Sequence, residues 1–388
     1  MGDLKQSLAD ALDGARQRSL GLLDPLSEED QLAQHSPLMS PLVWDLAHVG
    51  HYEELWLLRA VARTQPIDPA HDDIYDAFKH VRKERAKLAI LGPAEARSHI
   101  AMVRGRVFDV LEKVELDPAV PLLHDGFVYG MVAQHEHQHD ETMLATLQLM
   151  ASPTPYLHGG GPAPIPPAQA GTEVFVPGGP FVMGTDLEPF AYDNERPAHT
   201  VDVDPFWIDR FPVTNRQYLA FIEAGGYDDR RFWSETGWAH RQAEQLIAPL
   251  FWSPAGGGSW TVRRFGTVID LPLDEPVQHV CWYEAEAYAR FAGRRLPSEA
   301  EWEKASHANV ERLCGDVWQW TSSDFTAYPG FASFPYKEYS EVFYGSDYKV
   351  LRGGSWATSP LVARTTFRNW DYPIRRQIFA GFRCARDV

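Results

Sequence analysis

The chain has 388 residues, of which 44% are hydrophobic, and a formal net charge of −17. This length allows two domains of ordinary size, and the acidic balance argues against a nucleic-acid partner, because phosphate binding needs a basic surface. Three cysteines without CxxC spacing do not make a disulfide framework. The sequence shows neither a secretory signal pattern nor a run near the roughly 18 apolar residues of a membrane span, so we expect a cytoplasmic protein without a membrane partner.

The first 150 residues contain four segments in which apolar residues recur with helical spacing. They are residues 3–23, 41–62, 93–114 and 125–150. Ser40 is the expected N-cap of the second segment, and Pro41 fits its first turn. Four such helices predict a four-helix bundle that forms a first domain, residues 1–150.

The pattern changes after residue 150. Residues 151–171 are dominated by Pro, Gly and Ala, so we expect a linker without helix or strand. In residues 172–388, short apolar runs alternate with Gly and Pro and predict strands. The expected strands fall within 172–185, 199–214, 348–356 and 379–388, and the expected helices within 215–225 and 283–293. The fold class is therefore a two-domain α+β protein whose second domain has many irregular loops.

The stretch VAQHEHQHDETML concentrates histidines on the fourth predicted helix. Residues four apart share one helix face, so His135 and His139 point the same way and His137 points elsewhere. Two imidazoles at this spacing suit one metal ion. A third ligand must come from another helix, and His48, which lies among apolar residues in WDLAHVGHYEE, is the expected one, with His51 as its competitor.

Three imidazoles suit zinc, iron, copper or nickel, and the spacing does not select among these metals. The alternative, that these residues are core or solvated histidines, usually holds for a lone histidine. A pair at i and i+4 with a buried third histidine favours the metal site instead. Gln138 lies one turn after His135 and borders the same face.

The motifs around these residues are similar to those of a known family. SPLVWDLAHVG, EELWLLR and QHEHQHDETML resemble the DinB-like bundle of the ergothioneine sulfoxide synthases, the EgtB family. VPGGPFVMGT, NERPAHTVDVDPFWIDRFPVTN, RRLPSEAEWEKA, GDVWQWTSS, VLRGGSW and FRNWDYPIRRQIFAGFR resemble the second domain of that family, which is of the formylglycine-generating-enzyme type with a C-type-lectin-like fold. The resemblance covers nearly the whole chain.

The resemblance implies an enzyme with one non-heme iron(II) ion held by three histidines, which fall on His48, His135 and His139. It implies dioxygen as the oxidant and hercynine, the Nα-trimethylated histidine, as the acceptor. The reaction of the family joins a sulfur or selenium atom to C2 of the hercynine imidazole. Three protein ligands leave coordination positions at which the reactants can be ordered.

Further residues match family positions one by one. Gln138 matches a residue that hydrogen-bonds the bound imidazole. In FPYKEYSEVF, Tyr336 matches a tyrosine that donates a proton during the reaction, and a phenol is protonated at pH 7. Tyr339 matches a second tyrosine near the acceptor. Trp370 matches an aromatic residue beside the trimethylammonium group, where cation–π attraction has a physical basis.

The donor is the open part of the resemblance. Arg82, Arg85 and Asp371 match residues that grip the charged ends of a γ-glutamylcysteine donor. His51 stands where family members often have Gln and is a further candidate substrate contact. Only SHANVERLC separates EWEKA from GDVWQW, where the family usually has a long loop, and this puts a family calcium site in doubt.

The shortened loop favours selenoneine synthase, a close relative that uses a selenosugar with hercynine, and we take that as the expected activity. The alternative is a hercynine oxygenase, or sulfoxide synthase, that uses γ-glutamylcysteine or cysteine. A metal-dependent thiol S-transferase explains the three histidines but not the second domain, and a non-catalytic module with a structural zinc is a further alternative. Formylglycine generation is excluded, because it needs a cysteine pair near GGSW that this sequence lacks.

Overall fold

The computed structural model describes residues 2–152, 160–308 and 310–388. The chain divides into two compact units, Met1–His158 and Gly159–Val388. All described strands lie in the second unit, and the first unit is helical, so the expected two-domain α+β class is confirmed. No helix among the described residues has the length and apolar character needed to cross a membrane.

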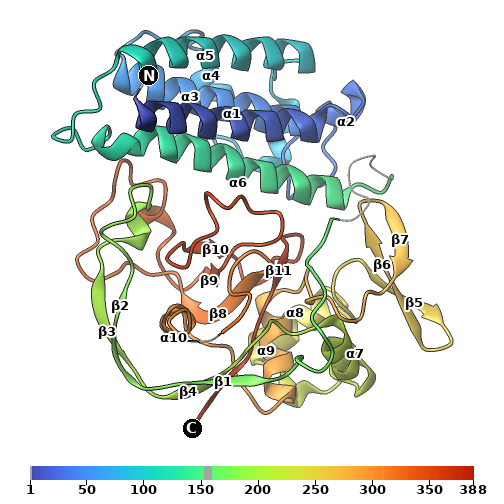
Figure 1. Ribbon diagram of the computed structural model, residues 1–388. Helices are drawn as coiled ribbons and strands as arrows, with labels where there is room; N and C mark the ends of the chain where they lie inside the picture. The colour runs from blue at the N-terminus through green and yellow to red at the C-terminus, as the bar shows by residue number, and fades with distance from the viewer. Residues whose placement is uncertain (1, 153–159, 309) are drawn as a thin grey trace. The chain divides into compact units, whose positions relative to one another are not determined.

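The first unit is a bundle of four long helices (Figure 1). These helices are α1 (Asp3–Leu23), α3 (Leu42–Glu53), α5 (Pro93–Lys113) and α6 (Phe127–Leu149), and the short helices α2 (Glu28–Leu32) and α4 (His71–Ile74) lie in the connections. Helix α1 packs against α5 and α6, and α3 packs against the same two helices. Each long helix therefore buries its apolar stripe against two neighbours.

Helix α3 is the most deeply placed of the four, since each of its residues is buried. It continues directly into a π-helical segment, Glu54–Val61, so the expected helix over 41–62 is present with a widened second half. The expected N-cap is wrong. Pro41 occupies the N-cap position, and Oγ of Ser40 instead accepts a hydrogen bond from the Arg85 guanidinium at 2.8 Å.

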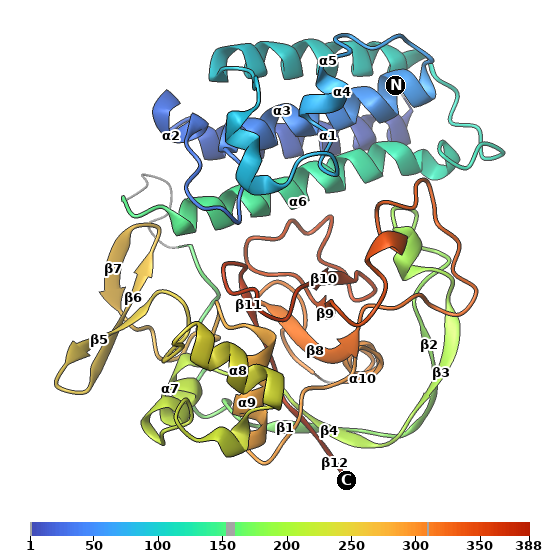
Figure 2. The ribbon, with the colours of Figure 1, turned by 180° about the vertical axis from the view of Figure 1, so that it is seen from behind.

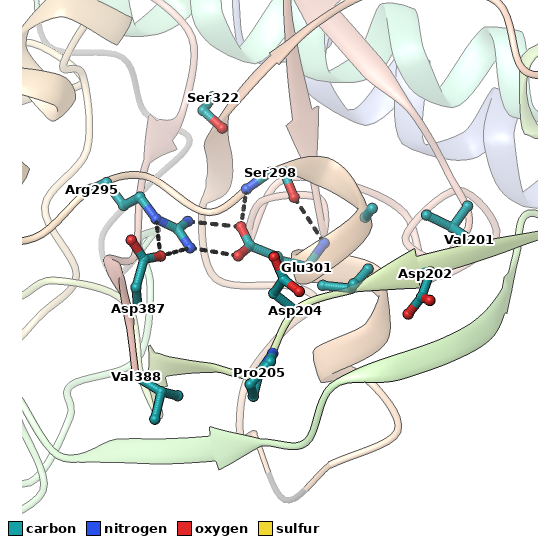
Figure 3. A pocket seen from close by; sticks show the side chains of 12 residues that line it. Val201, Asp202, Asp204, Pro205, Arg295, Ser298, Glu301, Ser322, Asp387 and Val388 are labelled. Carbon is teal, nitrogen blue, oxygen red and sulfur yellow. Dashed lines mark hydrogen bonds and ion pairs between the residues drawn. The ribbon is translucent and has the colours of Figure 1, made fainter.

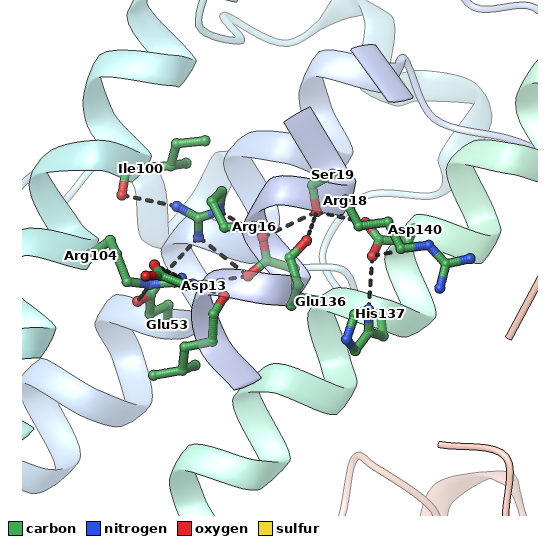
Figure 4. A network of polar contacts seen from close by, with 12 residues as sticks. Asp13, Arg16, Arg18, Ser19, Glu53, Ile100, Arg104, Glu136, His137 and Asp140 are labelled. Carbon is green, nitrogen blue, oxygen red and sulfur yellow. Dashed lines mark hydrogen bonds and ion pairs between the residues drawn. The ribbon is translucent and has the colours of Figure 1, made fainter. Parts of the chain in front are cut away.

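Each long helix contributes at least one charged residue to a buried network in the bundle (Figure 4). Arg16 of α1 pairs with Glu53 of α3 at 2.7 Å and with Glu136 of α6 at 2.6 Å. Arg104 of α5 pairs with the same two carboxylates at 2.5 and 3.1 Å. These two cations thus hold the two central carboxylates, and breaking one such pair costs about 3–5 kcal/mol. The network fixes the rotation of α6 about its axis and hence the directions of the residues beside Glu136.

The second unit combines four small sheets with helices and long loops. The sheets have the orders β1-β4-β12, β10-β9-β8-β11, β2-β3 and β5-β6-β7. Their strands are β1 (Glu173–Val176), β2 (Gly179–Met183), β3 (His199–Val203), β4 (Phe206–Asp209), β5 (Trp252–Gly256), β6 (Ser259–Arg264), β7 (Thr267–Asp270), β8 (Trp318–Asp324), β9 (Lys349–Arg352), β10 (Asn369–Asp371), β11 (Ala380–Gly381) and β12 (Ala385–Asp387). All neighbouring strands are antiparallel except β8 and β11.

Four helices accompany these sheets, of which the sequence predicted two. They are α7 (Asn215–Glu223), α8 (Glu235–Ala243), α9 (Trp282–Phe291) and α10 (Glu299–Ala305), and α7 to α9 lie together (Figure 2). Helices α8 and α10 were not expected, although α10 begins with a capping box in which Ser298 and Glu301 cap each other's backbone N–H groups. Part of the expected linker packs on this unit, because Ile165 is fully buried and its N–H donates to the Asp274 carbonyl at 2.7 Å.

Candidate metal centre

Three histidine side chains from two helices of the bundle converge on one point. His48 comes from α3, and His135 and His139 lie one turn apart on α6. One ring nitrogen of each lies within 4.8 Å of the others, and the Nε2 atoms of His48 and His135 are 3.3 Å apart. In the described part of the chain, no other group of three His, Cys, Asp or Glu side chains meets the same distance. These are the three residues that the sequence spacing singled out.

Hydrogen bonds at the far side of two rings orient them toward this point. Nδ1 of His48 is 2.7 Å from the backbone carbonyl oxygen of Tyr75, and Nδ1 of His139 is 3.0 Å from Oδ1 of Asp45. A carbonyl and a carboxylate only accept, so each Nδ1 carries the proton and donates it. The Nε2 atoms of both rings keep their lone pairs. Metal-ligating histidines show the same arrangement, in which the second ring nitrogen donates to a carboxylate or a carbonyl.

The environment keeps the His48 and His135 rings neutral. Burial lowers the pKa of His48 and of His135 well below the ordinary 6.5, and the nearby His139 lowers both further. Neutral imidazole is the form that binds a metal ion. Tyr52 stacks on the His135 ring with 3.7 Å between centroids and holds its plane. The donor set therefore fits a divalent metal ion such as iron(II) or zinc.

The Trp44 indole packs against a predicted metal ligand and a predicted donor-binding residue. Its ring stacks on His48 with 4.8 Å between centroids, and the guanidinium carbon of Arg85 lies 3.7 Å from its centroid. The Arg85 guanidinium also donates to the carbonyl oxygens of Ala77 and His80 at 2.9 and 3.1 Å. The segment that supplies these carbonyls also supplies the carbonyl that holds His48.

Arg82 and Arg85 lie on a short 3-10 turn, Arg82–Lys87, where residues three apart share one side. Arg82 donates to the carbonyl of Leu38 at 3.1 Å. Arg85 is only 5% exposed, and burial lowers its pKa to about 10. Neither guanidinium forms an ion pair with a carboxylate among the described residues, whereas Lys87 on the same turn pairs with Glu84. The carboxylates of Asp45 and Asp76 raise the pKa of Arg85 without forming an ion pair with it. An anion bound at this turn would therefore be attracted by both guanidinium groups.

The two remaining candidates of the first unit, Gln138 and His51, lie close in sequence to the three converging histidines. Gln138 is half-buried on α6, directly before His139. His51 lies one turn after His48 but faces Asp72, with 3.4 Å between its Nε2 and Oδ1. Burial lowers the pKa of His51 to about 4. The geometry thus favours His48 over His51 as the third ligand.

The four candidates of the second unit lie together in that unit. Tyr336 and Tyr339 meet nearly edge to face with 6.2 Å between ring centroids, and Tyr339 is perpendicular to Trp370 at 5.8 Å. Asp371 follows Trp370 on β10 and pairs with Arg375 at 3.2 Å. Residues more than 30 positions apart in the sequence therefore form one aromatic and acidic cluster.

An open groove of about 710 Å³ also lies in the second unit (Figure 3). On its wall, Arg295 pairs with Glu301 and with Asp387, each at 2.6 Å. None of the residues predicted to bind metal or substrate lines this groove. Because its central charges already neutralise one another, we assign it no role in the chemistry.

Two groups that orient the candidate metal ligands were missed from the sequence. Asp45 precedes His48 by one turn of the same helix, so an Asp at this spacing beside a candidate ligand was a usable signal. The carbonyl of Tyr75 gave no signal, because every residue carries one.

Comparisons with known proteins agree with this domain arrangement. Residues 11–143 match the DinB superfamily, and residues 162–313 and 306–388 match the sulfatase-modifying factor enzyme 1-like (FGE-sulfatase) domain. The chain is 46% identical over 438 aligned positions to a hercynine oxygenase of Mycolicibacterium smegmatis, with 99% of each chain covered. It is 47% identical over 432 positions to a hercynine oxygenase of Mycobacterium tuberculosis, again with 99% of each covered. The expected DinB-like bundle and formylglycine-generating-enzyme type of second domain are thereby confirmed.

The comparisons also agree with the shortened loop. An alignment of 438 positions with a chain of 388 residues leaves at least 50 positions without a residue of this chain. The match to the second family consists of two stretches that overlap at residues 306–313, which is the place where the sequence lacks the family's long loop. The shortened loop is therefore compatible with 46% identity to a hercynine oxygenase over nearly the whole of both chains.

The similarity extends over both domains and nearly the full length of the relatives, at an identity well above 30%. It includes the helices that carry the three converging histidines. On these grounds the chain belongs to the hercynine oxygenase family.

Proposed function

We propose that this protein is a hercynine oxygenase, an iron(II)-dependent enzyme that uses dioxygen to join a thiol sulfur to C2 of the hercynine imidazole. The observation that carries the proposal is the convergence of His48, His135 and His139 in a chain 46–47% identical to hercynine oxygenases. In this reaction the C2–H and S–H hydrogens are lost, one oxygen atom remains on sulfur as a sulfoxide, and the other leaves as water.

The metal site supports iron chemistry through its donor set. A bound iron(II) ion supplies open coordination positions and the capacity to reduce dioxygen. The protein contributes neutral rings of fixed orientation, held by Asp45 and by the Tyr75 carbonyl. Gln138 lies three residues after His135 on the same helix, and we assign its amide the role of orienting a bound imidazole. Within the second unit, Trp370 and Tyr339 are the aromatic residues that we assign to the trimethylammonium group.

The proposed donor is a thiol that carries carboxylates, such as γ-glutamylcysteine. The relatives are named hercynine oxygenases, so the expectation of a selenosugar donor is unsupported and the sulfur alternative is favoured. Arg82 and Arg85 support this choice, because a buried or half-buried cation without a carboxylate partner is matched by an anionic ligand and not by a neutral sugar. Cysteine remains the smaller alternative donor, and a cytoplasmic location remains a prediction.

The decisive experiment is mass spectrometry of the reaction products. The purified protein is loaded anaerobically with iron(II) and then given oxygen and hercynine together with γ-glutamylcysteine, cysteine or a selenosugar. We expect hercynine-dependent oxygen consumption and a sulfoxide product with γ-glutamylcysteine. A product formed only with the selenosugar would overturn the donor assignment. A protein that binds zinc and shows no hercynine-dependent oxygen consumption would overturn the proposed function itself.

The arginines are tested by steady-state kinetics of Arg82→Ala. A charge-assisted contact with a carboxylate contributes about 1.5–3 kcal/mol, so the KM for γ-glutamylcysteine should rise by about one to two orders of magnitude. The KM for hercynine should stay near the wild-type value. Lys83→Ala, which removes an exposed cation from the same turn, is the matched control. Equal effects of the two substitutions would mean that Arg82 makes no specific contact with the donor.

A further inference from the structure

One short turn of the second unit is hydrogen-bonded to both ends of the loop that carries Tyr336. The turn is a 3-10 helix, Asp193–Glu195, and the Asp193 side chain belongs to a residue that is 4% exposed. Its Oδ2 accepts from the Phe334 N–H at 3.1 Å, and its Oδ1 accepts from the Ser340 hydroxyl at 2.6 Å. These two donors lie on either side of Tyr336 and of Tyr339. A single carboxylate thus closes residues 334–340 into a fixed loop.

The residues beside Asp193 extend the same support. The Tyr192 ring, 1% exposed, stacks on the Tyr339 ring with 4.0 Å between centroids and 16° between planes. On the other side, Oε2 of Glu195 accepts hydrogen bonds from the Arg364 guanidinium and the Thr366 hydroxyl, each at 2.8 Å. These two residues lead into β10, which contains Trp370 and Asp371. The turn therefore orders both segments that carry the candidate substrate residues of this unit.

The surroundings of Asp193 indicate that its role is directed at the loop. Burial raises the pKa of its carboxyl group, and the bonds from Ser340 and Phe334 oppose that rise. No ion pair to Asp193 is present within residues 2–152, 160–308 and 310–388. Keeping a carboxylate away from water without a cation is unfavourable unless its hydrogen bonds compensate. The Asp193 carboxylate receives a hydrogen bond from the backbone of Asn194 and two from the Tyr336 loop, the Phe334 N–H and the Ser340 hydroxyl. The two contacts with the loop make the carboxylate and the loop conformation depend on each other.

We propose that Asp193 is a positioning residue that keeps the Tyr336 hydroxyl in place and thereby directs the reaction toward C–S bond formation. The inference rests on the proposed function. With Tyr336 in place, hercynine and the thiol give the sulfoxide and water, and O2 accepts four electrons from the C–H and S–H bonds and the sulfur. With the hydroxyl displaced, the thiol alone takes up both oxygen atoms and becomes a sulfinic acid, which also accounts for all four electrons.

The test compares Asp193→Ala with Asp193→Asn. Alanine removes both acceptors. Asparagine keeps the shape, because its Oδ1 can accept from the Phe334 N–H while its Nδ2 donates to the Ser340 hydroxyl oxygen. A displacement of about 1 Å can cost 10²-fold in a positioned reaction, so we expect Asp193→Ala to lower the ratio of sulfoxide to sulfinic acid by about 10- to 100-fold. Asp193→Asn should restore most of that ratio.

Two further variants keep the test decisive if Asp193→Ala fails to fold. Ser340→Ala removes one of the two contacts and should lower the ratio in the same direction, whereas Glu341→Ala, an exposed neighbour, should leave it unchanged. Iron(II) affinity should be the same in all of these proteins. A wild-type enzyme that forms sulfoxide, with variants whose product ratio is unchanged, overturns the positioning role alone. A wild-type enzyme that forms no sulfoxide overturns the proposed function and this inference together.

Discussion

The carboxylate of Asp45 should determine how tightly the bundle holds its metal ion. Asp45 is 1% exposed, and its Oδ1 is 3.0 Å from Nδ1 of His139. This contact fixes the tautomer of the His139 ring and directs its Nε2 lone pair toward the other two histidines. Without it the ring is free to rotate, and a proton on Nε2 would block the metal. The same helix, α3, thus supplies one ligand, His48, and the support of another.

The size of the effect follows from this geometry. Loss of such a supporting group typically weakens metal binding by about 10- to 100-fold, which is about 1.4–2.7 kcal/mol. Asp45→Asn keeps an oxygen that can accept from Nδ1 and removes only the charge. Its Kd for the metal should therefore rise by only about 10-fold. Asp45→Leu fills the same buried space but leaves the Nδ1–H without an acceptor, which costs about 1–3 kcal/mol. The Kd of Asp45→Leu should therefore rise by about 100-fold.

Anaerobic titration with cobalt(II), followed by visible absorption, measures the Kd without the complication of oxygen chemistry. Urea unfolding of the metal-free proteins separates a loss of affinity from a loss of fold. Asp109→Ala, which removes an exposed carboxylate of the same bundle, is the control. A Kd for Asp45→Leu equal to that of the wild type would refute the orientation argument, and so would a larger loss in Asp45→Asn than in Asp45→Leu.

Three further outcomes are expected. His137→Ala should bind metal like the wild type while His139→Ala loses it, as measured by the same titration, and an equal loss in both would disprove the helix-face argument. Tyr336→Phe should keep the hercynine KM but slow C–S bond formation and raise the share of sulfinic acid among the products, as measured by mass spectrometry. An unchanged rate and product ratio would mean that Tyr336 serves only in packing. Burial lowers the pKa of His51 from 6.5 to about 4, so the unfolded state takes up a proton first as the pH falls through 6.5, and stability declines until about pH 4. Protonation of this group should make the metal-free protein about 2 kcal/mol less stable at pH 5 than at pH 7. In urea unfolding, His51→Gln should lack this contribution to the pH dependence of the free energy of unfolding. A pH dependence identical in His51→Gln and the wild type would contradict the buried, neutral state of His51.

The bundle and its three histidines were accessible from the sequence because their pattern is local and regular. The expected segments 3–23 and 125–150 correspond closely to α1, Asp3–Leu23, and α6, Phe127–Leu149. In an unbroken helix, side-chain direction follows from position alone. The spacing of His135 and His139 was therefore sufficient to place them on one face, and the choice of His48 needed only a buried position on a second helix.

Other features could not be predicted, because residues far apart in the sequence determine them. Arg85 stands in a charged stretch, FKHVRKERAKL, that looks like solvated surface. It is buried because Trp44 and Ser40, more than 40 positions earlier, provide a stacking surface and an acceptor. Helix α10 is a different case. Its capping box, Ser298 with Glu301, was visible in the sequence, but only seven residues follow the cap, which is too short for a clear helical repeat.

The segment between Ile74 and His80 explains why part of the site leaves no trace in the sequence. Its carbonyl oxygens accept from the Trp44 indole, from His48 and twice from Arg85. Carbonyls inside a helix or a sheet are already used by backbone N–H groups, so an irregular segment is needed to supply acceptors to side chains. Because any residue carries a carbonyl, these four contacts depend on the path of the segment and not on the identity of its side chains. The orientation of a metal ligand and of the proposed donor-binding cation therefore depends on the same stretch of backbone, and a change in its path would disturb both.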